Sequence, residues 1–187
     1  TRCFIMKKSV LLLFLLLFLN EASASIKENI IQNLKNTDNL SFNFEQNING
    51  KVEIGNCIVK YPKKIFCKYD TENKKTLISN GESLVIKTST SFYIYPVKKT
   101  PLNLILDKNF LLKKVRDSDE RLIDNKFINF SFSQDENKIN VFFDKNTYNL
   151  IGWQTLDIYQ NLSITYIFSI LRNQKLDKNQ FSLPNRN

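Results

Sequence analysis

The chain has 187 residues with 27 basic and 18 acidic side chains, a formal net charge of +9, and no histidine. Without histidine a Ser-His-Asp triad, a Cys-His pair, a histidine general base and most zinc sites are excluded, so any catalysis would depend on carboxylates. The acidic residues fall mostly at turns and on polar faces, and the four glycines are too scattered for a phosphate-binding loop. We therefore expect no enzyme, no metal and no cofactor, with a carboxylate-based hydrolase as the disfavoured alternative.

We expect residues 1–24 to consist of an over-extended gene start followed by a cleaved secretory signal peptide. Met6 and the two lysines after it form a positive segment, Val10–Leu19 is an unbroken apolar run, and Ala22-Ser23-Ala24 is a cleavage signature. The run is about half the roughly twenty residues that a membrane-spanning helix needs, which disfavours a membrane anchor. No cysteine for a lipid anchor follows the run. We expect a soluble periplasmic protein that begins near Ser25.

Residues 25–187 are predicted to form a single domain, since no internal repeat or long linker divides them. This part remains basic, which suggests anionic partners. Its lysines are spread through many polar turns rather than gathered on one helix, and the chain is expected to be exported. We therefore predict no nucleic-acid partner.

The segment Ser25 to Thr37 has a helical period. Ile26, Ile30, Ile31 and Leu34 share one face, and the intervening positions are polar. Ser25 stands three residues before Glu28, the spacing of a capping box. The pattern predicts one amphipathic helix.

After this helix the period changes to two, which is typical of half-buried strands. The alternating segments begin with Leu40, Phe42 and Phe44 and return at 52–54, 77–79, 84–86, 92–94, 128–132, 139–143 and 162–168. Short turns rich in Asn, Gly, Pro and Asp separate them, so neighbouring strands are expected to pair in order. Only Thr100 to Lys114 interrupts the series, and it reads as one or two short helices after Pro101.

These elements predict a mainly β protein with helices (α+β), whose sheet of about ten or eleven antiparallel strands has to hide one apolar face. Two helical pieces cannot cover so large a sheet, so we expect it to wrap around them as an incomplete antiparallel β-barrel. Its many aromatic residues either line an apolar cavity or simply fill a core, and composition leaves both readings open.

Several motifs resemble, in order, those of the LolA family of periplasmic outer-membrane lipoprotein carriers. They are the strand Leu40–Gln46, the strand-proline turn-strand Gly55–Tyr69, the turn Leu77–Gly81, the helix start Thr100–Leu106, the strand Leu150–Asp157 and the closing Phe181–Pro184. The resemblance covers the whole predicted domain. It implies an unclosed barrel with an N-terminal helix and a short helical lid, agreeing with the fold expected from the strand pattern.

The resemblance also implies a chaperone that binds lipoprotein acyl chains in an apolar cavity and carries lipoproteins from the inner to the outer membrane. The implied partners are those lipoproteins, an inner-membrane lipoprotein-releasing ABC transporter and an outer-membrane receptor where one exists; the protein is expected to be a monomer. The alternative is a secreted lipid-sensing or envelope-interaction module on the same fold. From alternation and family position, the expected cavity lining is Phe42, Phe44, Ile65, Cys67, Leu84, Ile86, Phe130, Phe132, Val141, Phe143 and Trp153, and the expected lid is Leu102, Leu104, Ile105 and Leu106.

The residue before the turn proline departs from the family pattern. Many members have an arginine there that helps to hold the lid closed, and this chain has Tyr61. A tyrosine hydroxyl can donate a hydrogen bond to a lid carbonyl but lacks the charge and five donors of arginine. Tyr61 is therefore the expected lid latch, with a turn aromatic that shields Pro62 as the alternative.

Cys57 and Cys67 are the only cysteines after the expected cleavage site. They stand five residues on either side of Pro62, so a hairpin centred there places them opposite one another on one face. An exported protein with an even pair of cysteines usually bridges them. We predict a Cys57–Cys67 disulfide; the alternative is two buried thiols that act as small apolar side chains.

Overall fold

The computed structural model describes residues 25–134, 137–156 and 160–185, so the expected signal peptide lies outside the described residues. The first described helix, α2 (Ile26–Lys35), is the amphipathic helix predicted from sequence. The Ser25 hydroxyl accepts a hydrogen bond from the backbone N–H of Glu28 at 3.2 Å, which caps the helix start. Ile30, Ile31 and Leu34 form its buried face.

Within the described residues the strands form one antiparallel sheet that does not close into a barrel. The strands are β1 (Asn39–Ile48), β2 (Lys51–Lys60), β3 (Lys64–Tyr69), β4 (Thr76–Asn80), β5 (Ser83–Lys87), β6 (Phe92–Pro96), β7 (Arg121–Ile123), β8 (Phe127–Gln134), β9 (Asn137–Asp144), β10 (Leu150–Leu156) and β11 (Leu162–Arg172). The expected α+β class and open sheet are confirmed. The short edge strand β7 was not predicted, because its three residues carry no clear alternation.

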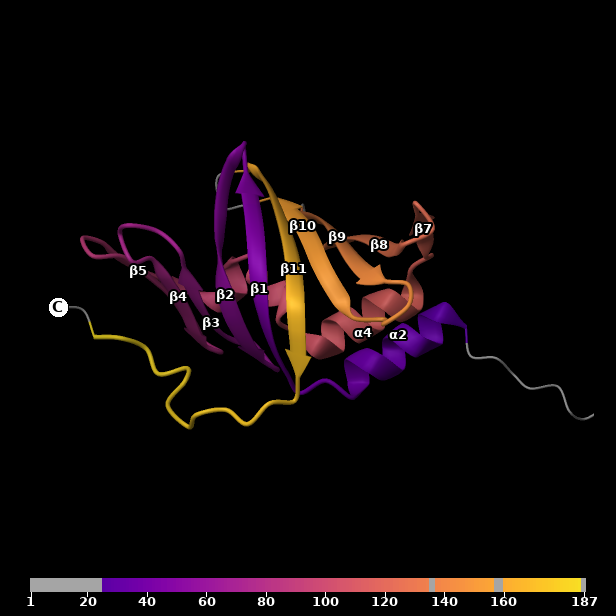
Figure 1. Cartoon of the computed structure of the whole chain (residues 1–187), viewed down its shortest axis with the longest axis horizontal. Coiled ribbons are helices and arrows are strands. Elements are labelled where there is room, and N and C mark those ends of the chain that lie inside the picture. The colour runs from indigo at the N-terminus through magenta and orange to yellow at the C-terminus, as the bar shows by residue number, and fades with distance from the viewer. Residues whose placement is uncertain (1–24, 135–136, 157–159, 186–187) are drawn as a thin grey trace, which may run out of the picture.

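The strand order is β6-β5-β4-β3-β2-β1-β11-β10-β9-β8-β7. Pairing follows chain order within 39–96 and within 121–172, as expected from the short turns. The exception is that β6 does not pair with β7, the next strand along the chain; these two form opposite edges, and β1 pairs with β11 instead. Figure 1 shows the strands spreading from β1 and β11 toward the two edges.

The segment between β6 and β7 is helical, as predicted. It contains the 3-10 turn η1 (Val97–Lys99), the short helix α3 (Leu102–Ile105) and the helix α4 (Lys108–Asp117). The Asp107 carboxylate accepts the backbone N–H of Phe110 at 3.1 Å and so caps α4. In Figure 1, α4 lies beside α2 on one side of the sheet.

We call the sheet face that packs against these helices the inner face and the opposite one the outer face. Inward-pointing strand residues and the buried residues of α2, α3 and α4 form one hydrophobic cluster. Gly55 on β2 permits this packing, since a Cβ there would lie 2.1 Å from the Lys68 carbonyl oxygen and 2.9 Å from the Phe44 ring. The inner face is therefore the main core of the protein.

The chain after β11 crosses the outer face. This extended segment, residues 173–185, which we call the strap, is the yellow trace in Figure 1 that passes β3 to β5. Its Phe181 is buried, as are Ile78 on β4 and Val85 on β5, and none of the three belongs to the inner-face cluster. The strap thus covers part of the outer face over β2 to β5.

Candidate functional site

The structure brings the eleven expected cavity residues together on the inner face. Ten are buried in the inner-face cluster, and Ile86 is half-buried against it. They come from β1, β3, β5, β8, β9 and β10, strands that span nearly the whole sheet. Their common face is thus an apolar surface that faces the helices, and whether it receives a ligand stays a prediction.

Aromatic rings give this surface its bulk. Phe130 and Phe143 lie edge to face with centroids 5.9 Å apart, and Phe132 lies in the same way 5.6 Å from Phe110 of α4. Phe44 lies 4.9 Å from Tyr69, which sequence analysis did not select. Such edge-to-face rings interact favourably with one another.

The expected lid residues occupy α3 and the position after it. Ile105 and Leu106 are buried, while Leu102 and Leu104 are half-buried against the same cluster. The lid also holds a polar group in an unfavourable place: the Asn103 side-chain oxygen is buried and has no hydrogen-bond partner among the described residues. A buried acceptor without a partner typically costs about 1 to 3 kcal/mol.

The β2–β3 turn is tied to this lid through Lys63. Its backbone N–H donates to the Leu106 carbonyl at 2.9 Å, and its ammonium group lies 3.4 Å from the Asp107 carboxylate. These two contacts join the turn to the end of α3 and the start of α4. The connection of the turn to the lid therefore involves the residue after Pro62.

Tyr61, the expected latch, is half-buried against the core. Burial raises the pKa of its hydroxyl well above the ordinary value, so the hydroxyl stays protonated. No hydrogen bond from it to a lid carbonyl occurs among the described residues, and the Lys108 ammonium lies 5.9 Å from the ring centroid. An effect of the hydroxyl on the lid stays a prediction.

Lys108 joins α4 to α2. Its ammonium group donates to the carbonyls of Lys35 at 3.2 Å and Thr37 at 3.0 Å, and it lies 3.4 Å from the Asp38 carboxylate. The carbonyls at a helix C-terminus lack intrahelical partners, so a cation there is favourable. Lys108 therefore fixes the start of α4 against the end of α2.

The inner face becomes polar toward the β1–β2 hairpin. Gln46 donates to the hydroxyls of Ser163 at 3.3 Å and Thr165 at 3.1 Å. The Glu53 carboxylate pairs with the ammonium groups of Lys75 and Lys51. Burial would raise the pKa of Glu53, but the hydrogen bond and charge of Lys75, assisted by Lys51, outweigh burial and hold it below its ordinary value.

Cys57 and Cys67 are directly opposed in the β2–β3 register, and the structure joins them by a disulfide. Both belong to the inner-face cluster. The bridge joins β2 to β3, the strand that carries the expected lining residues Ile65 and Cys67.

No group of three or more Cys, Asp or Glu side chains is arranged to hold a metal ion in 25–134, 137–156 and 160–185. In the same ranges no helix has both the length and the apolar character to cross a membrane. Asp157, the last residue of the motif at 150–157, lies outside the described residues.

Residues 35–184 match the family model described as outer membrane lipoprotein carrier protein LolA. No curated protein sequence matches the chain. The match covers most of the chain and nearly all of the described residues.

The solved structures to which this chain is similar share little sequence with it. An uncharacterized conserved protein from Thermus thermophilus is 7% identical with a TM-score of 0.50, over 86% of this chain and 93% of that one. A LolA superfamily protein from Nitrosomonas europaea is 8% identical with a TM-score of 0.43, over 84% and 96%. A chain of the Pseudomonas aeruginosa MucA/MucB complex is 9% identical with a TM-score of 0.49, over 86% and 62%.

Proposed function

Since the chain belongs to the LolA family, we propose that it is a periplasmic chaperone that carries lipoproteins from the inner to the outer membrane. The observation that carries this proposal is the inner face, where the sheet presents an apolar surface closed by the short helix α3. The family is one of carriers rather than enzymes, and the proposed function needs no covalent step.

An apolar surface of this kind suits a cargo whose acyl chains have to be kept out of water. Each methylene that leaves a membrane for water costs about 0.8 kcal/mol, so a lipoprotein needs a substitute apolar shell during transit. The aromatic and aliphatic residues of the inner face supply one once the lid moves. Acyl chains would then replace the contacts that α3 makes in the closed form.

The lid is suited to such a movement. Helix α3 has only four residues, and two of its leucines are half-buried rather than fully buried. The unpaired oxygen of Asn103 disfavours the closed position, because opening exposes it to water. The Lys63 contacts to Leu106 and Asp107 oppose opening, so the lid is held by a few breakable interactions.

The remaining parts of the proposal follow the route of the cargo. Residues 1–24 act as the signal peptide that brings the protein to the periplasm. An inner-membrane lipoprotein-releasing ABC transporter loads the carrier, and an outer-membrane receptor accepts the cargo where one exists. The protein acts as a monomer.

The proposal is tested by loading from membranes. Protein lacking residues 1–24 is mixed with inner-membrane vesicles that contain the ABC transporter and a lipoprotein, and ATP is added. We expect the lipoprotein to leave the vesicles in a complex with the carrier and then to pass to outer-membrane vesicles. Release without delivery would favour the lipid-sensing alternative, and no release would overturn the proposal.

A matched pair of substitutions locates the site. Leu104→Glu places a charge on the lid where it faces the core, and Leu162→Glu makes the same change on the exposed outer face. We expect the first variant to lose most of its loading and the second to keep it, with circular dichroism confirming that both are folded. Equal loading would contradict the assignment of the inner face.

A further inference from the structure

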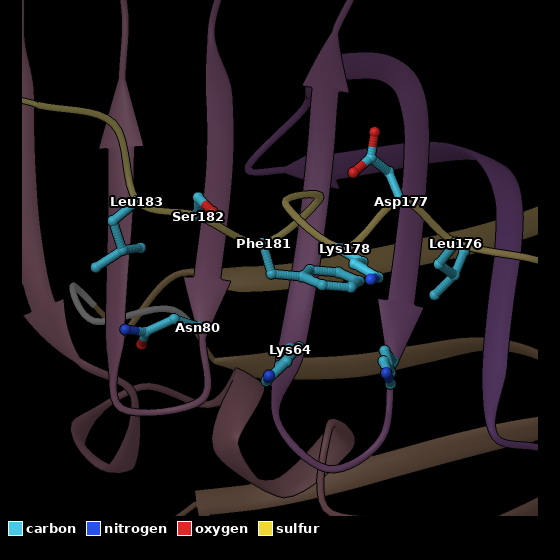
Figure 2. A pocket seen from close by; sticks show the side chains of 9 residues that line it. Lys64, Asn80, Leu176, Asp177, Lys178, Phe181, Ser182 and Leu183 are labelled. Atoms are coloured by element: carbon cyan, nitrogen blue, oxygen red, sulfur yellow. The ribbon is translucent and has the colours of Figure 1, made fainter.

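A cavity lies on the outer face of the sheet, between the strap and the ends of β2, β3 and β4. Its volume is about 570 Å³, within the range of ligand pockets, and Figure 2 shows it from close by. Lys60, Lys64 and Asn80 are register partners across the three strands and point to the outer face. The strap supplies the facing wall, which includes Lys178, Phe181 and Ser182.

Three lysine side chains line this cavity. None of the ammonium groups of Lys60, Lys64 and Lys178 has an ion pair or hydrogen bond with any of the described residues. Lys60 and Lys64 are directly opposed on neighbouring strands, and like charges in that position repel each other. The strap brings the third positive charge to the same place, so the fold concentrates charge here without compensating it.

The one acidic residue of the cavity does not neutralise these lysines. The Asp177 carboxylate accepts the backbone N–H of Asn179 at 2.9 Å, and Figure 2 shows it directed away from Lys64 and Asn80. Its distance to each lysine exceeds that of an ion pair, because no such pair occurs among the described residues. The cavity is therefore net positive.

The neutral groups of the cavity complete a site for an oxyanion. The Asn80 side-chain oxygen already accepts the backbone N–H groups of Glu82 and Ser83, which leaves its NH₂ group as the available donor. Ser182 adds a hydroxyl. Phe181 is buried and also lines the cavity, so the polar donors share the site with an apolar ring.

We propose that this cavity binds a phosphate group, held by Lys60, Lys64 and Lys178 with Ser182 and Asn80 as neutral donors. A phosphate oxyanion accepts several charge-assisted hydrogen bonds at once and would relieve the repulsion between Lys60 and Lys64. The phosphate can belong to a lipid headgroup or to a free phosphate compound. Because the site is on the outer face, it is separate from the proposed acyl-binding surface.

The test compares two variants that remove the same charge. The cavity variant, Lys64→Gln with Lys178→Gln, removes two positive charges from the cavity lining. The control variant, Lys126→Gln with Lys138→Gln, removes two exposed lysines elsewhere. Calorimetry at low salt measures binding of inorganic pyrophosphate, and co-sedimentation measures binding to vesicles of phosphatidylglycerol or of the zwitterionic phosphatidylcholine. We expect the cavity variant to bind about tenfold or more weakly and the control variant to bind as the parent does.

The results distinguish a free phosphate compound from a lipid headgroup, and they either support or overturn the proposal. Loss of binding to pyrophosphate in the cavity variant alone indicates a free phosphate compound, and loss only with phosphatidylglycerol vesicles indicates a lipid headgroup. An equal loss in both variants would mean that only net charge matters and would overturn the proposal. Absence of binding to both probes would also overturn it, whatever the result of the lipoprotein-loading experiment.

Discussion

Apolar side chains lie on both faces of β11, but in opposite environments. Ile167 points to the inner face and is 0% exposed, whereas Tyr166 beside it points outward and is 52% exposed. Ile164 and Phe168 share the outward position of Tyr166, and the Tyr166 and Phe168 rings stack 5.8 Å apart in solvent. Apolar character alone therefore does not identify the buried face of this strand.

The two faces of the sheet differ in the segments that pack on them. The inner face has α2, α3 and α4 packed on it, while the strap covers the outer face only over β2 to β5. Tyr166 stands opposite Gly152 on β10 and Glu45 on β1, which offer no apolar partner. Burial in this sheet is therefore decided by which distant segment lies on top of a strand.

The largest expected effect comes from replacing one aromatic residue on each face of the sheet. Phe143→Ala removes a fully buried ring and should lower the free energy of unfolding by about 3 to 5 kcal/mol. Tyr166→Ala removes an exposed ring and should change it by less than about 1 kcal/mol. Urea unfolding followed by circular dichroism measures both, and similar losses would mean that the outer stripe is covered in solution.

The inner-face disulfide should have the next largest effect. Cys57→Ala with Cys67→Ala opens a short covalent loop, so we expect the free energy of unfolding to fall by about 2 to 3 kcal/mol. Thiol counting on denatured, unreduced protein checks the bridge independently. Two free thiols in periplasmically expressed protein would contradict it.

A smaller effect of opposite sign is expected in the lid. Asn103→Leu removes the unpaired buried oxygen and should stabilise the closed form by about 1 kcal/mol, which slows loading about fivefold. Asn33→Leu offers no comparable gain, because the Asn33 amide donates to the Thr147 carbonyl. Unchanged loading kinetics in Asn103→Leu would show that Asn103 does not oppose closure.

The smallest effect concerns the polar end of the inner face. The pKa of Glu53 is lowered in the folded protein, so its contribution to stability is present above the unfolded pKa and is lost as pH falls through the folded one. Lys75→Met should therefore reduce stability by up to about 1 kcal/mol at neutral pH and weaken the decline below about pH 4.5. Parallel pH profiles for parent and variant would contradict this.

Local patterns predicted much of this molecule. Ser25 and Glu28 marked the start of the first helix, and the symmetric placement of Cys57 and Cys67 about Pro62 predicted their opposed positions, because hairpin register follows from the turn. The alternation at 162–168 predicted a strand but not its orientation. Its inward residues include Ser163 and Thr165, whose polarity is satisfied by Gln46.

The features that sequence analysis missed depend on segments far apart in the chain. The strap meets β2, β3 and β4 only in the folded state, so neither the charge of Lys178 nor the apolar ring of Phe181 signals the cavity in advance. Asn103 looks like an ordinary polar residue of a short helix until the core surrounds its oxygen. Such placements follow from packing rather than from any local period.

The pairing of β1 with β11 has a consequence for the order of folding. A ribosome makes the chain from its N-terminus, so β1 and its partner on the other side, residues 162–172, emerge more than a hundred residues apart. Until the later strand arrives, β1 has one unpaired edge of N–H and C=O groups, and such an edge can recruit other chains. The incomplete chain should therefore be prone to aggregate through the open edge of β1.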